Sequence, residues 1–348
     1  MKISIDGRLI GKDQPPYIIA ELSGNHNGSL DRAINSIEAA YRCGASAVKV
    51  QTYTAETMTI DCKRPEFLIK GGLWDGFTLY DLYKWAQTPF EWHRVMFDHA
   101  RRIGITIFST PFDETAVELL EQLDAPAYKI ASFENTDLPL IECVAKTNKP
   151  VIISTGMATE HEIGEAVETA RVAGCSSLVL LHCVSSYPAP IEQMNISRIQ
   201  ALGSRFSVLS GLSDHTLGTT ASIAGVALGA CVIEKHFTLS RADKGPDSEF
   251  SLEPEEFTHL CQTATSTWKA LGKQGFDRQP NEEGNRFFRR SIYFVRDLPA
   301  GSIVSREDIR RIRPGMGLPP KEFENILGKR LKWAVQRGTP TSWEVFEG

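Results

Sequence analysis

The sequence predicts an α/β fold in which a (β/α)8 TIM barrel is followed by a small second domain. Three observations support this prediction. Eight short β-branched or apolar runs recur before residue 240, helical spacing of apolar residues separates most of them, and the pattern changes after residue 272. Eight such units over roughly 250 residues match the size of a (β/α)8 barrel. A doubly wound sheet is the alternative, but it usually has fewer strands, and the sequence has no GxGxxG motif.

Each predicted strand ends in polar residues. Because parallel strands carry functional groups at their carboxyl ends, the pattern indicates a site at one mouth of the barrel. The predicted strands are YIIAEL (17–22), AVKVQT (47–52), ITIFST (105–110), AYKIAS (127–132), PVIIST (150–155), LVLLHC (178–183), SVLSGLSDH (207–215) and CVIEKHFT (231–238). Apolar spacing of three and four predicts helices over 31–44, 89–104, 113–124, 138–148, 160–174 and 216–230.

Two of these strands, consecutive in the chain, each end in a histidine. His215 closes SVLSGLSDH, and His236 lies near the end of CVIEKHFT. Two imidazoles at matching strand ends predict a divalent metal site. The alternative is a pair of hydrogen-bonded core histidines.

Alternation along the strands predicts which side chains point into the barrel. In AVKVQT, Lys49 and Gln51 lie on the face opposite to Val48 and Val50, and in AYKIAS Lys129 has the same inward position. An unpaired ammonium inside a protein costs several kcal/mol, so each lysine requires an anion. Two inward lysines favour a bound phosphate or carboxylate.

Other polar groups follow the strands. Ion pairs of the two lysines with Glu21 or Glu134 are the alternative to a bound anion. The hydroxyl groups predict an oxyanion cradle, or else simple helix N-caps. They belong to Ser109, Thr110, Ser132, Ser154, Thr155, Ser185, Ser186 and Ser213. A third carboxylate, Asp247, lies in the loop after the last strand and joins the site unless it is a solvated surface acid.

The connection over residues 53–88 is too long for an ordinary strand-to-helix loop. Such loops are often lids, although a dimer contact or a satellite core is equally compatible with its composition. Its aromatic residues include Trp74, Phe77, Tyr80, Tyr83 and Trp85.

The chain after the barrel divides in two. Residues 273–288 are polar and punctuated by Gly and Pro, which predicts a linker, and residues 289–348 predict a domain of short strands and turns. Roughly 60 residues bury little core, so this domain is expected to dock on something, the barrel mouth being a candidate.

Bulk properties exclude several classes of partner. The net charge is −5 and no basic run occurs, which argues against nucleic acid and anionic membranes. No apolar run reaches the roughly 20 residues of a membrane span, and MKISIDGRLIG lacks an apolar signal core, so we expect a cytoplasmic protein. The seven cysteines are scattered without a CxxC motif, which indicates neither a disulfide framework nor a zinc knuckle.

Motifs along the whole chain closely resemble the sialic acid synthase family. They are AELSGNHNG, KVQT, FSTPFD, YKIAS, STGMA, HCVSSYPAP, LSDHT, EKHFT and RPGMG, in this order. The resemblance implies an antifreeze-protein-like (SAF) domain over 289–348. It also implies condensation of phosphoenolpyruvate with an N-acetylated amino sugar to a nine-carbon 2-keto acid and phosphate.

Within the family, SGNHNG, KVQTYTAETMTID and SSYPAP resemble the branch that makes pseudaminic acid. The N-acetylneuraminate branch tends to have Asn where Ser185 stands and another residue at Ser23, so transfer of the phosphate contact at position 185 is weakened. N-acetylneuraminate or legionaminate synthesis is the near alternative, and a metal-dependent aldolase or lyase is the remoter one. A sugar-binding module is the non-enzymatic alternative.

The resemblance also implies roles for individual residues. His215 and His236 would bind Mn²⁺, with Mg²⁺ or Co²⁺ as alternatives, and Arg313 would reach the neighbouring barrel in a domain-swapped homodimer. The positions matching phosphoenolpyruvate contacts are Lys49, Thr110, Lys129, Ser132, Ser154 and Ser213. The positions matching sugar-side or acid–base groups are Glu21, Gln51, Glu134, Tyr187 and Asp247.

Overall fold

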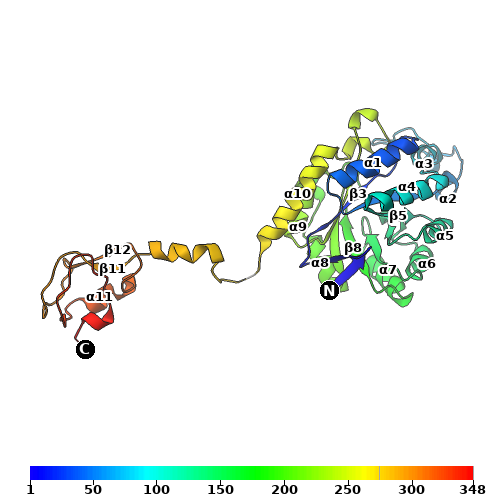
Figure 1. The fold of residues 1–348 in the computed structure, drawn as a ribbon. Coiled ribbons are helices and arrows are strands. Elements are labelled where there is room, and N and C mark those ends of the chain that lie inside the picture. Colours follow the sequence, from blue (N-terminus) through cyan, green and yellow to red (C-terminus); the bar gives the residue numbers. More distant parts are fainter. Residues whose placement is uncertain (274, 348) are drawn as a thin grey trace. The chain divides into compact units, whose positions relative to one another are not determined.

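A computed structural model describes residues 1–273 and 275–347; position 274 of the predicted linker and position 348 lie outside the described residues. The chain divides into two compact units, Met1–Gly272 and Lys273–Gly348, which Figure 1 colours along the sequence.

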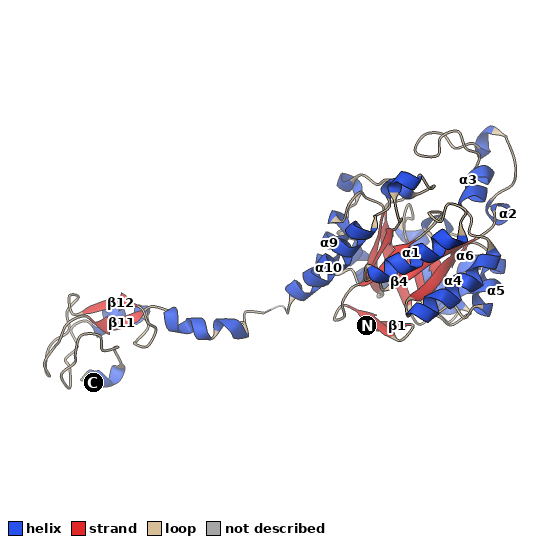
Figure 2. Cartoon of the chain, turned by 45° about the horizontal axis from the view of Figure 1, so that its top comes forward, coloured by secondary structure: helices blue, strands red, loops and turns tan. Residues whose placement is uncertain are grey.

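The first unit is a closed barrel of eight parallel strands, which confirms the predicted fold class. Around the barrel the strands follow the order β10-β3-β4-β5-β6-β7-β8-β9, so neighbours in sequence are neighbours in space. Figure 2 shows these strands enclosed by helices. Their bounds are β3 Tyr17–Glu21, β4 Ala47–Thr52, β5 Thr106–Pro111, β6 Tyr128–Ile130, β7 Val151–Ser154, β8 Leu178–Cys183, β9 Leu209–Asp214 and β10 Val232–His236.

Local capping sets where several helices begin. The Ser29 hydroxyl accepts from the third backbone N–H after it, and Thr159 forms a reciprocal capping box with Glu162. The helices of this unit are α1 Leu30–Arg42, α2 Ala55–Met58, α3 Leu79–Ala86, α4 Phe90–Ile103, α5 Glu114–Gln122, α6 Leu138–Ala145, α7 Glu160–Val172, α8 Arg198–Phe206, α9 Thr220–Ala227 and α10 Pro254–Leu271.

The sequence pattern did not predict α8 and α10. α8 contains Gly203 and α10 is rich in threonine, and both residue types have low intrinsic helix propensity. Burial outweighs this propensity in α10, where Phe257 and Leu260 are fully enclosed.

Strand alternation is confirmed. Val48, Val50, Tyr128 and Ile130 belong to the cluster that packs the strands against helix residues such as Phe97. The opposite faces of β4 and β6 therefore point into the barrel, which is where Lys49 and Lys129 lie buried.

An N-terminal hairpin, which the sequence pattern did not predict, packs on the amino-terminal end of the barrel. Its strands β1 Lys2–Ile5 and β2 Arg8–Gly11 pair antiparallel. Ile3, Ile5 and Ile10 pack with apolar residues of the barrel interior, including Tyr17 and Phe108. This end is filled with apolar side chains, so the polar interior opens at the carboxyl ends of the strands.

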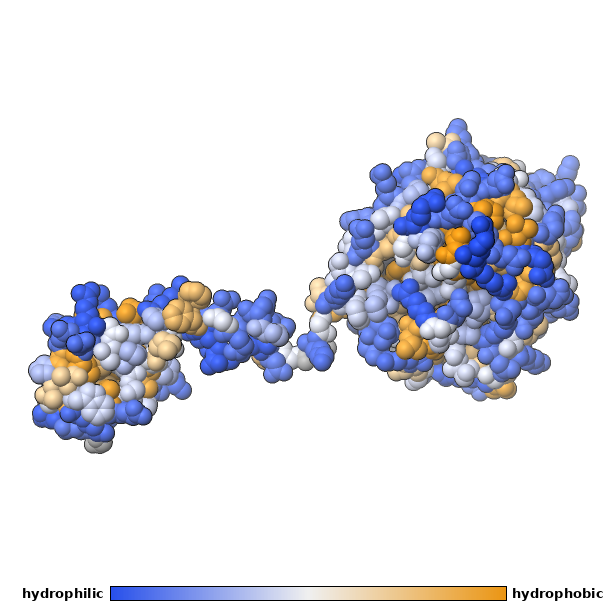
Figure 3. Space-filling model, viewed as in Figure 1, coloured by the Kyte–Doolittle hydropathy of each residue, from blue (hydrophilic) through white to orange (hydrophobic). Residues whose placement is uncertain are grey.

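The second unit has a small core of its own. Strands β11 Ser291–Phe294 and β12 Ile309–Ile312 pair antiparallel, and α11 Phe323–Ile326 packs beside them. Two short 3-10 helices, Pro280–Glu282 and Gly284–Phe288, occupy part of the predicted linker. In Figure 3 the visible surface of each unit is mainly hydrophilic with smaller apolar areas. Among the helices described here, none has the length and apolar character needed to cross a bilayer. The core of the second unit comprises Ile292, Phe294, Val304, Ile309, Ile326, Leu331, Val335, Val345 and Phe346.

Candidate active site

A cavity of about 400 Å³ lies at the carboxyl ends of the strands. One part of its lining is polar and includes the inward-facing side chains of β4 and β10. The other part is apolar and comes largely from the 53–88 connection. The lining residues are Ser23, Gln51, Tyr53, Met58, Ile69, Trp74, Leu79, Leu82, Tyr83, Ala86, Phe112, Ala131, Phe133, Glu134, Tyr187, His236, Pro246 and Asp247.

Four buried charged groups form a network inside the barrel. Lys49 Nζ lies 2.8 Å from Glu21 Oε2 and 3.7 Å from Glu234 Oε2, and it donates to Thr110 Oγ1 at 3.0 Å. Lys129 Nζ lies 3.8 Å from Glu234 Oε1. The ion-pair alternative to a bound anion is thus present for both lysines, but Lys129 uses Glu234 instead of the expected Glu134.

The two ammonium groups share two carboxylates, but they share them unequally. Burial lowers the pKa of Lys129, and the distant contact with Glu234 offsets this only in part. Burial also lowers the pKa of Lys49, but its close carboxylates outweigh that effect and raise it. Lys129 is therefore the less compensated of the two ammonium groups, and a phosphate or carboxylate beside it would stabilise its charged form.

Sequence reasoning missed Glu234. It lies on β10 two residues before His236, so alternation alone points it into the barrel with that histidine. Its carboxylate accepts from Ser213 Oγ at 2.9 Å and lies near both lysines. The position was identifiable from the same two-residue period that selected Lys49.

Some of the predicted hydroxyl groups converge. Gly156 N–H donates to Ser132 Oγ at 3.1 Å, and a Cβ at position 156 would collide with Ser132 and Ser185. Ser154 Oγ is buried without a hydrogen-bond partner among the described residues. Ser132 and Ser154 thus keep hydroxyl hydrogens that could donate to an anionic ligand, whereas the Ser213 hydroxyl already donates to Glu234.

Ser109 and Thr155 do not belong to this group of hydroxyls, contrary to the prediction. Ser109 Oγ donates to Val50 O at 3.0 Å, and Thr155 Oγ1 donates to Leu181 O at 3.0 Å. Both hydroxyls therefore donate to backbone carbonyls of strands. Each residue is next to an inward-facing residue in the chain, so its side chain lies on the opposite face of the strand.

The two histidine rings lie side by side with their centroids 5.3 Å apart. His236 ends β10, and His215 directly follows β9. His215 Nδ1 donates to Val184 O at 3.0 Å, which leaves Nε2 as its free nitrogen. Within the described part of the chain His236 Nδ1 is buried without a hydrogen-bond partner, and burial, reinforced by His215 and Lys49, holds its pKa well below the ordinary value.

These features fit a metal ligand pair better than two satisfied core histidines. His236 has the neutral form that binds a metal. For His215 burial lowers the pKa, but Cys183 outweighs burial and raises it, so this ring must release a proton to bind one. Asp247 Oδ2 lies 4.0 Å from His236 Nδ1. Among residues 1–273 and 275–347 no group of three or more His, Cys, Asp or Glu side chains has metal-binding geometry, so water and substrate oxygen would complete the shell.

Asp247 is buried and joins a chain of hydrogen bonds that reaches Glu21. Ser23 Oγ donates to Asp247, Gln51 Nε2 donates to Ser23 Oγ at 3.2 Å, and the same amide donates to Glu21 Oε1 at 2.9 Å. The solvated-acid alternative for Asp247 is therefore wrong. This chain ties the last loop of the barrel to its first two strands.

The 53–88 connection supplies a wall of the cavity. Trp74 Nε1 donates to Pro246 O at 2.9 Å, and its ring lies 5.7 Å from the ring of Tyr187. Tyr187 also packs against His215 at 4.5 Å and Phe250 at 5.4 Å. Aromatic rings thus surround the histidine pair and limit its contact with water.

Glu134 is a titrating carboxyl at the cavity. It closes the short 3-10 helix Ser132–Glu134 that follows β6. Burial raises its pKa to about 7, although Lys129 acts in the opposite direction. A carboxyl with this pKa exchanges a proton readily near neutral pH, as a general acid or base requires.

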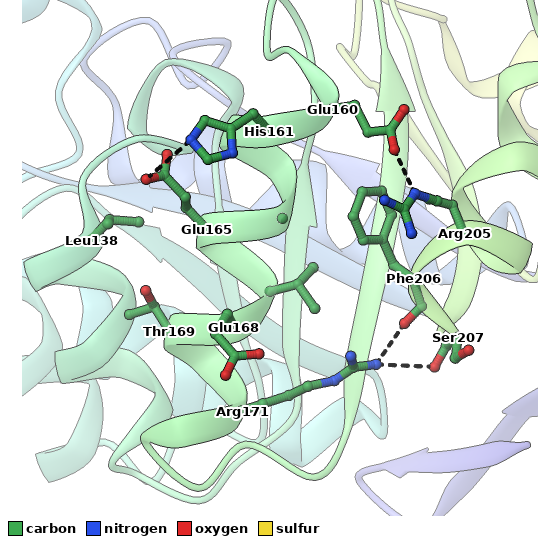
Figure 4. Close-up of a pocket in the computed structure, with 12 residues that line it drawn as sticks. Leu138, Glu160, His161, Glu165, Glu168, Thr169, Arg171, Arg205, Phe206 and Ser207 are labelled. Carbon is green, nitrogen blue, oxygen red and sulfur yellow. Dashed lines mark hydrogen bonds and ion pairs between the residues drawn. The ribbon is translucent and has the colours of Figure 1, made fainter.

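A larger pocket of about 970 Å³ lies on the outside of the barrel against α7 (Figure 4). Several of its polar groups already have partners. Arg205 Nε pairs with Glu160 Oε1 at 2.5 Å, Arg171 donates to the carbonyls of Phe206 and Ser207, and His161 lies 3.7 Å from Glu165. The barrel mouth, where polar groups remain unpaired, is the better candidate site.

Arg313 is the predicted site residue that the barrel does not contain. It follows β12 in the second unit. Its expected role in a neighbouring barrel stays a prediction.

Two family models cover most of the chain. The NeuB family model matches residues 36–275, and the SAF domain model matches residues 289–347. A pseudaminic acid synthase of Campylobacter jejuni is 44% identical over 326 residues, covering 94% of this chain and 95% of that protein. A pseudaminic acid synthase of Helicobacter pylori is 43% identical over 335 residues, covering 96% and 98%.

A solved relative shares the fold. The crystal structure of N-acetylneuraminic acid (sialic acid) synthetase from Leptospira borgpetersenii in complex with citrate is 32% identical with a TM-score of 0.74, covering 82% of this chain and 95% of that one. The resemblance that the motifs indicate is confirmed, and the chain belongs to the NeuB family.

Proposed function

We propose that this protein is a pseudaminic acid synthase. It condenses phosphoenolpyruvate with 2,4-diacetamido-2,4,6-trideoxy-altrose to a nine-carbon 2-keto sugar acid and phosphate. The observation that carries the proposal is the barrel mouth itself, where two buried lysines, a group of hydroxyls and the His215–His236 pair share one end of the barrel. Similarity to pseudaminic acid synthases over nearly the full chain supports the choice of sugar.

Residues of this chain account for binding of the anionic substrate. Lys129 is the less compensated of the two lysines, and the serines around Gly156 offer hydroxyl groups to a phosphate. We assign Lys49, Thr110, Lys129, Ser132, Ser154, Ser185 and Ser213 to phosphoenolpyruvate. Charge-assisted hydrogen bonds of this kind would stabilise the phosphate more strongly as it leaves.

The histidine pair fits a divalent ion. Held by His215 and His236, the ion, Mn²⁺ in the first place and Mg²⁺ or Co²⁺ as alternatives, would polarise the aldehyde oxygen of the open-chain sugar. Gln51, Tyr187 and Asp247 line the cavity and Glu21 accepts from Gln51, which suits the sugar side of the reaction.

Two σ bonds form and one breaks, while the enol C=C and the aldehyde C=O become single bonds, the aldehyde oxygen takes up a proton and carbon 2 ends as a ketone. Carbon 3 of phosphoenolpyruvate attacks the aldehyde carbon, water adds to carbon 2, and the carbon–oxygen bond to phosphate breaks. Glu134, whose pKa lies at about 7, accepts the proton of the adding water. Lys129 and the group of hydroxyls hold the departing phosphate.

The apolar wall suits a 6-deoxy sugar with two acetamido groups, because methyl groups gain from contact with Met58, Ile69, Leu79, Phe112 and Phe133. The proposal includes a domain-swapped homodimer in which Arg313 reaches the barrel of a second copy and holds an N-acyl group.

The purified protein should be incubated with Mn²⁺, phosphoenolpyruvate and, separately, the diacetamido-trideoxy altrose, the legionaminate precursor and N-acetylmannosamine. We expect phosphate release and a nine-carbon keto acid with the altrose sugar, and none after chelation of the metal. Preference for another sugar would contradict the specificity. Pyruvate formation without phosphate release would instead favour a metal-dependent aldolase.

A further inference from the structure

A second charge network lies directly behind the histidine pair. Lys235 and Asp214 are fully buried, and Lys235 Nζ lies 3.1 Å from Asp214 Oδ2. They are partners in the β9–β10 register and precede His236 and His215 by one residue each. Since side chains alternate along a strand, the pair occupies the helix-facing side of the same two strand ends whose inner side carries the histidines.

Each group of this pair contacts the backbone that follows His215. Asp214 Oδ1 accepts from Thr216 N–H at 2.9 Å and from Thr216 Oγ1 at 2.8 Å. Lys235 Nζ donates to Thr216 O. The N–H and the C=O of Thr216 are thus both held, and the chain on either side of His215 is fixed to β10.

The pair is also anchored to a helix. Ser222 Oγ of α9 donates to Asp214 Oδ2 at 2.5 Å. Asp214 therefore has four partners within one compact region, in which strand β9, strand β10 and helix α9 meet.

Stability alone is a weak reason for such a pair. Desolvating two charges costs several kcal/mol per ion, and replacing a buried pair with apolar residues of similar volume is often neutral or stabilising. The pair instead affects geometry, because its contacts fix the spacing and orientation of two strand ends. That spacing sets the distance between the two histidine rings, 5.3 Å between centroids.

We infer that Asp214 and Lys235 are positioning residues that set the divalent-metal affinity of the His215–His236 pair by clamping Thr216. The inference rests on the proposed function in one respect, that the histidine pair binds a metal. Residues that orient metal ligands in this way change metal affinity by about 10- to 100-fold when they are removed.

The test uses the full chain without substrates. Asp214→Leu/Lys235→Met removes both charges together, so neither is left buried and unpaired. Asp214→Asn/Lys235→Met also removes both charges but keeps an oxygen that accepts from Thr216. Arg205→Gln/Glu160→Gln removes an exposed pair on α7 and α8 and is the matched control. Mn²⁺ affinity is measured by titration of the free-ion electron paramagnetic resonance signal, and folding by thermal unfolding of the metal-free protein.

We expect the Leu/Met variant to unfold cooperatively near the wild-type temperature and to bind Mn²⁺ about 10- to 100-fold more weakly. The Asn/Met variant should recover part of this loss, and the control should bind like wild type. Unchanged affinity in a folded Leu/Met variant would overturn the inference. If that variant does not fold, Ser222→Ala, which removes one hydrogen bond to Asp214, must weaken Mn²⁺ binding measurably, and unchanged binding there overturns it as well.

The same experiment distinguishes failure of the metal assignment from failure of the positioning role. Wild-type protein that binds no Mn²⁺ would overturn the metal assignment of the proposed function and the inference with it. Wild-type binding with unaffected variants would overturn the positioning role alone. In turnover assays the weakened variants should require more metal while the KM for phosphoenolpyruvate at saturating metal stays within about twofold.

Discussion

At the scale of single residues, burial sets the proton affinity of Glu134. Its pKa rises to about 7 because the cavity withdraws the carboxyl from water more than Lys129 compensates. A carboxyl with this pKa is largely protonated below pH 6 and largely ionised above pH 8, so any step that needs the carboxylate gains rate across that interval.

Glu134→Gln should remove this pH dependence. In the wild type we expect kcat/KM to rise with pH through an apparent pKa of about 7, and in the glutamine variant we expect a lower rate without that limb. The measurement is a pH profile of phosphate release from pH 5.5 to 8.5. If the variant kept the same rise of kcat/KM with pH, the titrating group would not be Glu134.

The same pKa links Glu134 to folding stability. Because its folded pKa lies above the ordinary 4.5, the folded protein retains a proton that the unfolded chain releases between about pH 4.5 and 7. Its contribution to stability is thus present at low pH and lost as the pH rises through 7. Denaturant unfolding at pH 5 and pH 8 should show a smaller pH difference for Glu134→Gln than for wild type.

Lys129→Met should weaken the binding of phosphoenolpyruvate more than the binding of the sugar. The methionine keeps the volume and removes the charge that a phosphate would neutralise, while Glu234 retains Lys49 at 3.7 Å. We expect the KM for phosphoenolpyruvate to rise about tenfold or more, equivalent to about 1.4 kcal/mol. The KM for the sugar should change by less than about threefold. Lys146→Met, at an exposed lysine after α6, is the control, and an equal effect of Lys129→Met on both substrates would contradict the assignment.

At the scale of elements, the 53–88 connection forms a wall of the cavity, and Trp74 makes its contacts with the last barrel loop and with Tyr187. Trp74 joins it to the last barrel loop through Pro246 O and to Tyr187 through its ring. These contacts close the apolar side of the cavity, which is the side assigned to the methyl groups of the sugar.

Trp74→Ala should therefore raise the KM for the sugar by about tenfold and leave the KM for phosphoenolpyruvate nearly unchanged. Trp74→Phe keeps most of the ring contact and loses only the hydrogen bond, so its effect should be smaller. Steady-state kinetics with each substrate varied in turn distinguishes these cases. If only the KM for phosphoenolpyruvate rose, the assignment of the apolar wall to the sugar would be wrong.

At the scale of the whole molecule, the predicted site residues are distributed over both compact units. The barrel holds all predicted site residues except Arg313, which lies in the second unit. A site shared between copies predicts that two differently damaged chains complement each other in one dimer.

Mixed dimers of Arg313→Ala and His236→Ala chains should recover activity, because one barrel keeps its histidines and receives the intact arginine from the other chain. Random mixing is expected to restore up to about a quarter of the wild-type sites. Mixing His215→Ala with His236→Ala is the control, since both changes remove a proposed metal ligand from the barrel and no mixed dimer contains an intact barrel. Verified mixed dimers without recovery would argue against the shared site.

Local sequence determined much of the barrel. Alternation in AVKVQT and AYKIAS was sufficient to place Lys49 and Lys129 inside and their neighbours against the helices, because a strand has only two faces. The position of His215 and His236 at neighbouring strand ends followed equally from the order of the strands. Such inferences need only the period of one strand and the rule that consecutive units lie side by side.

Tertiary structure alone decided which groups meet. Ser23 contacts Asp247 across 224 positions, Trp74 reaches Pro246 across 172, and both lysines share Glu234. The N-terminal hairpin that packs on the apolar end of the barrel was likewise invisible in the strand pattern. The physical reason is that local spacing sets the direction in which a side chain points, whereas its partner depends on how barrel closure and loop packing bring distant segments together.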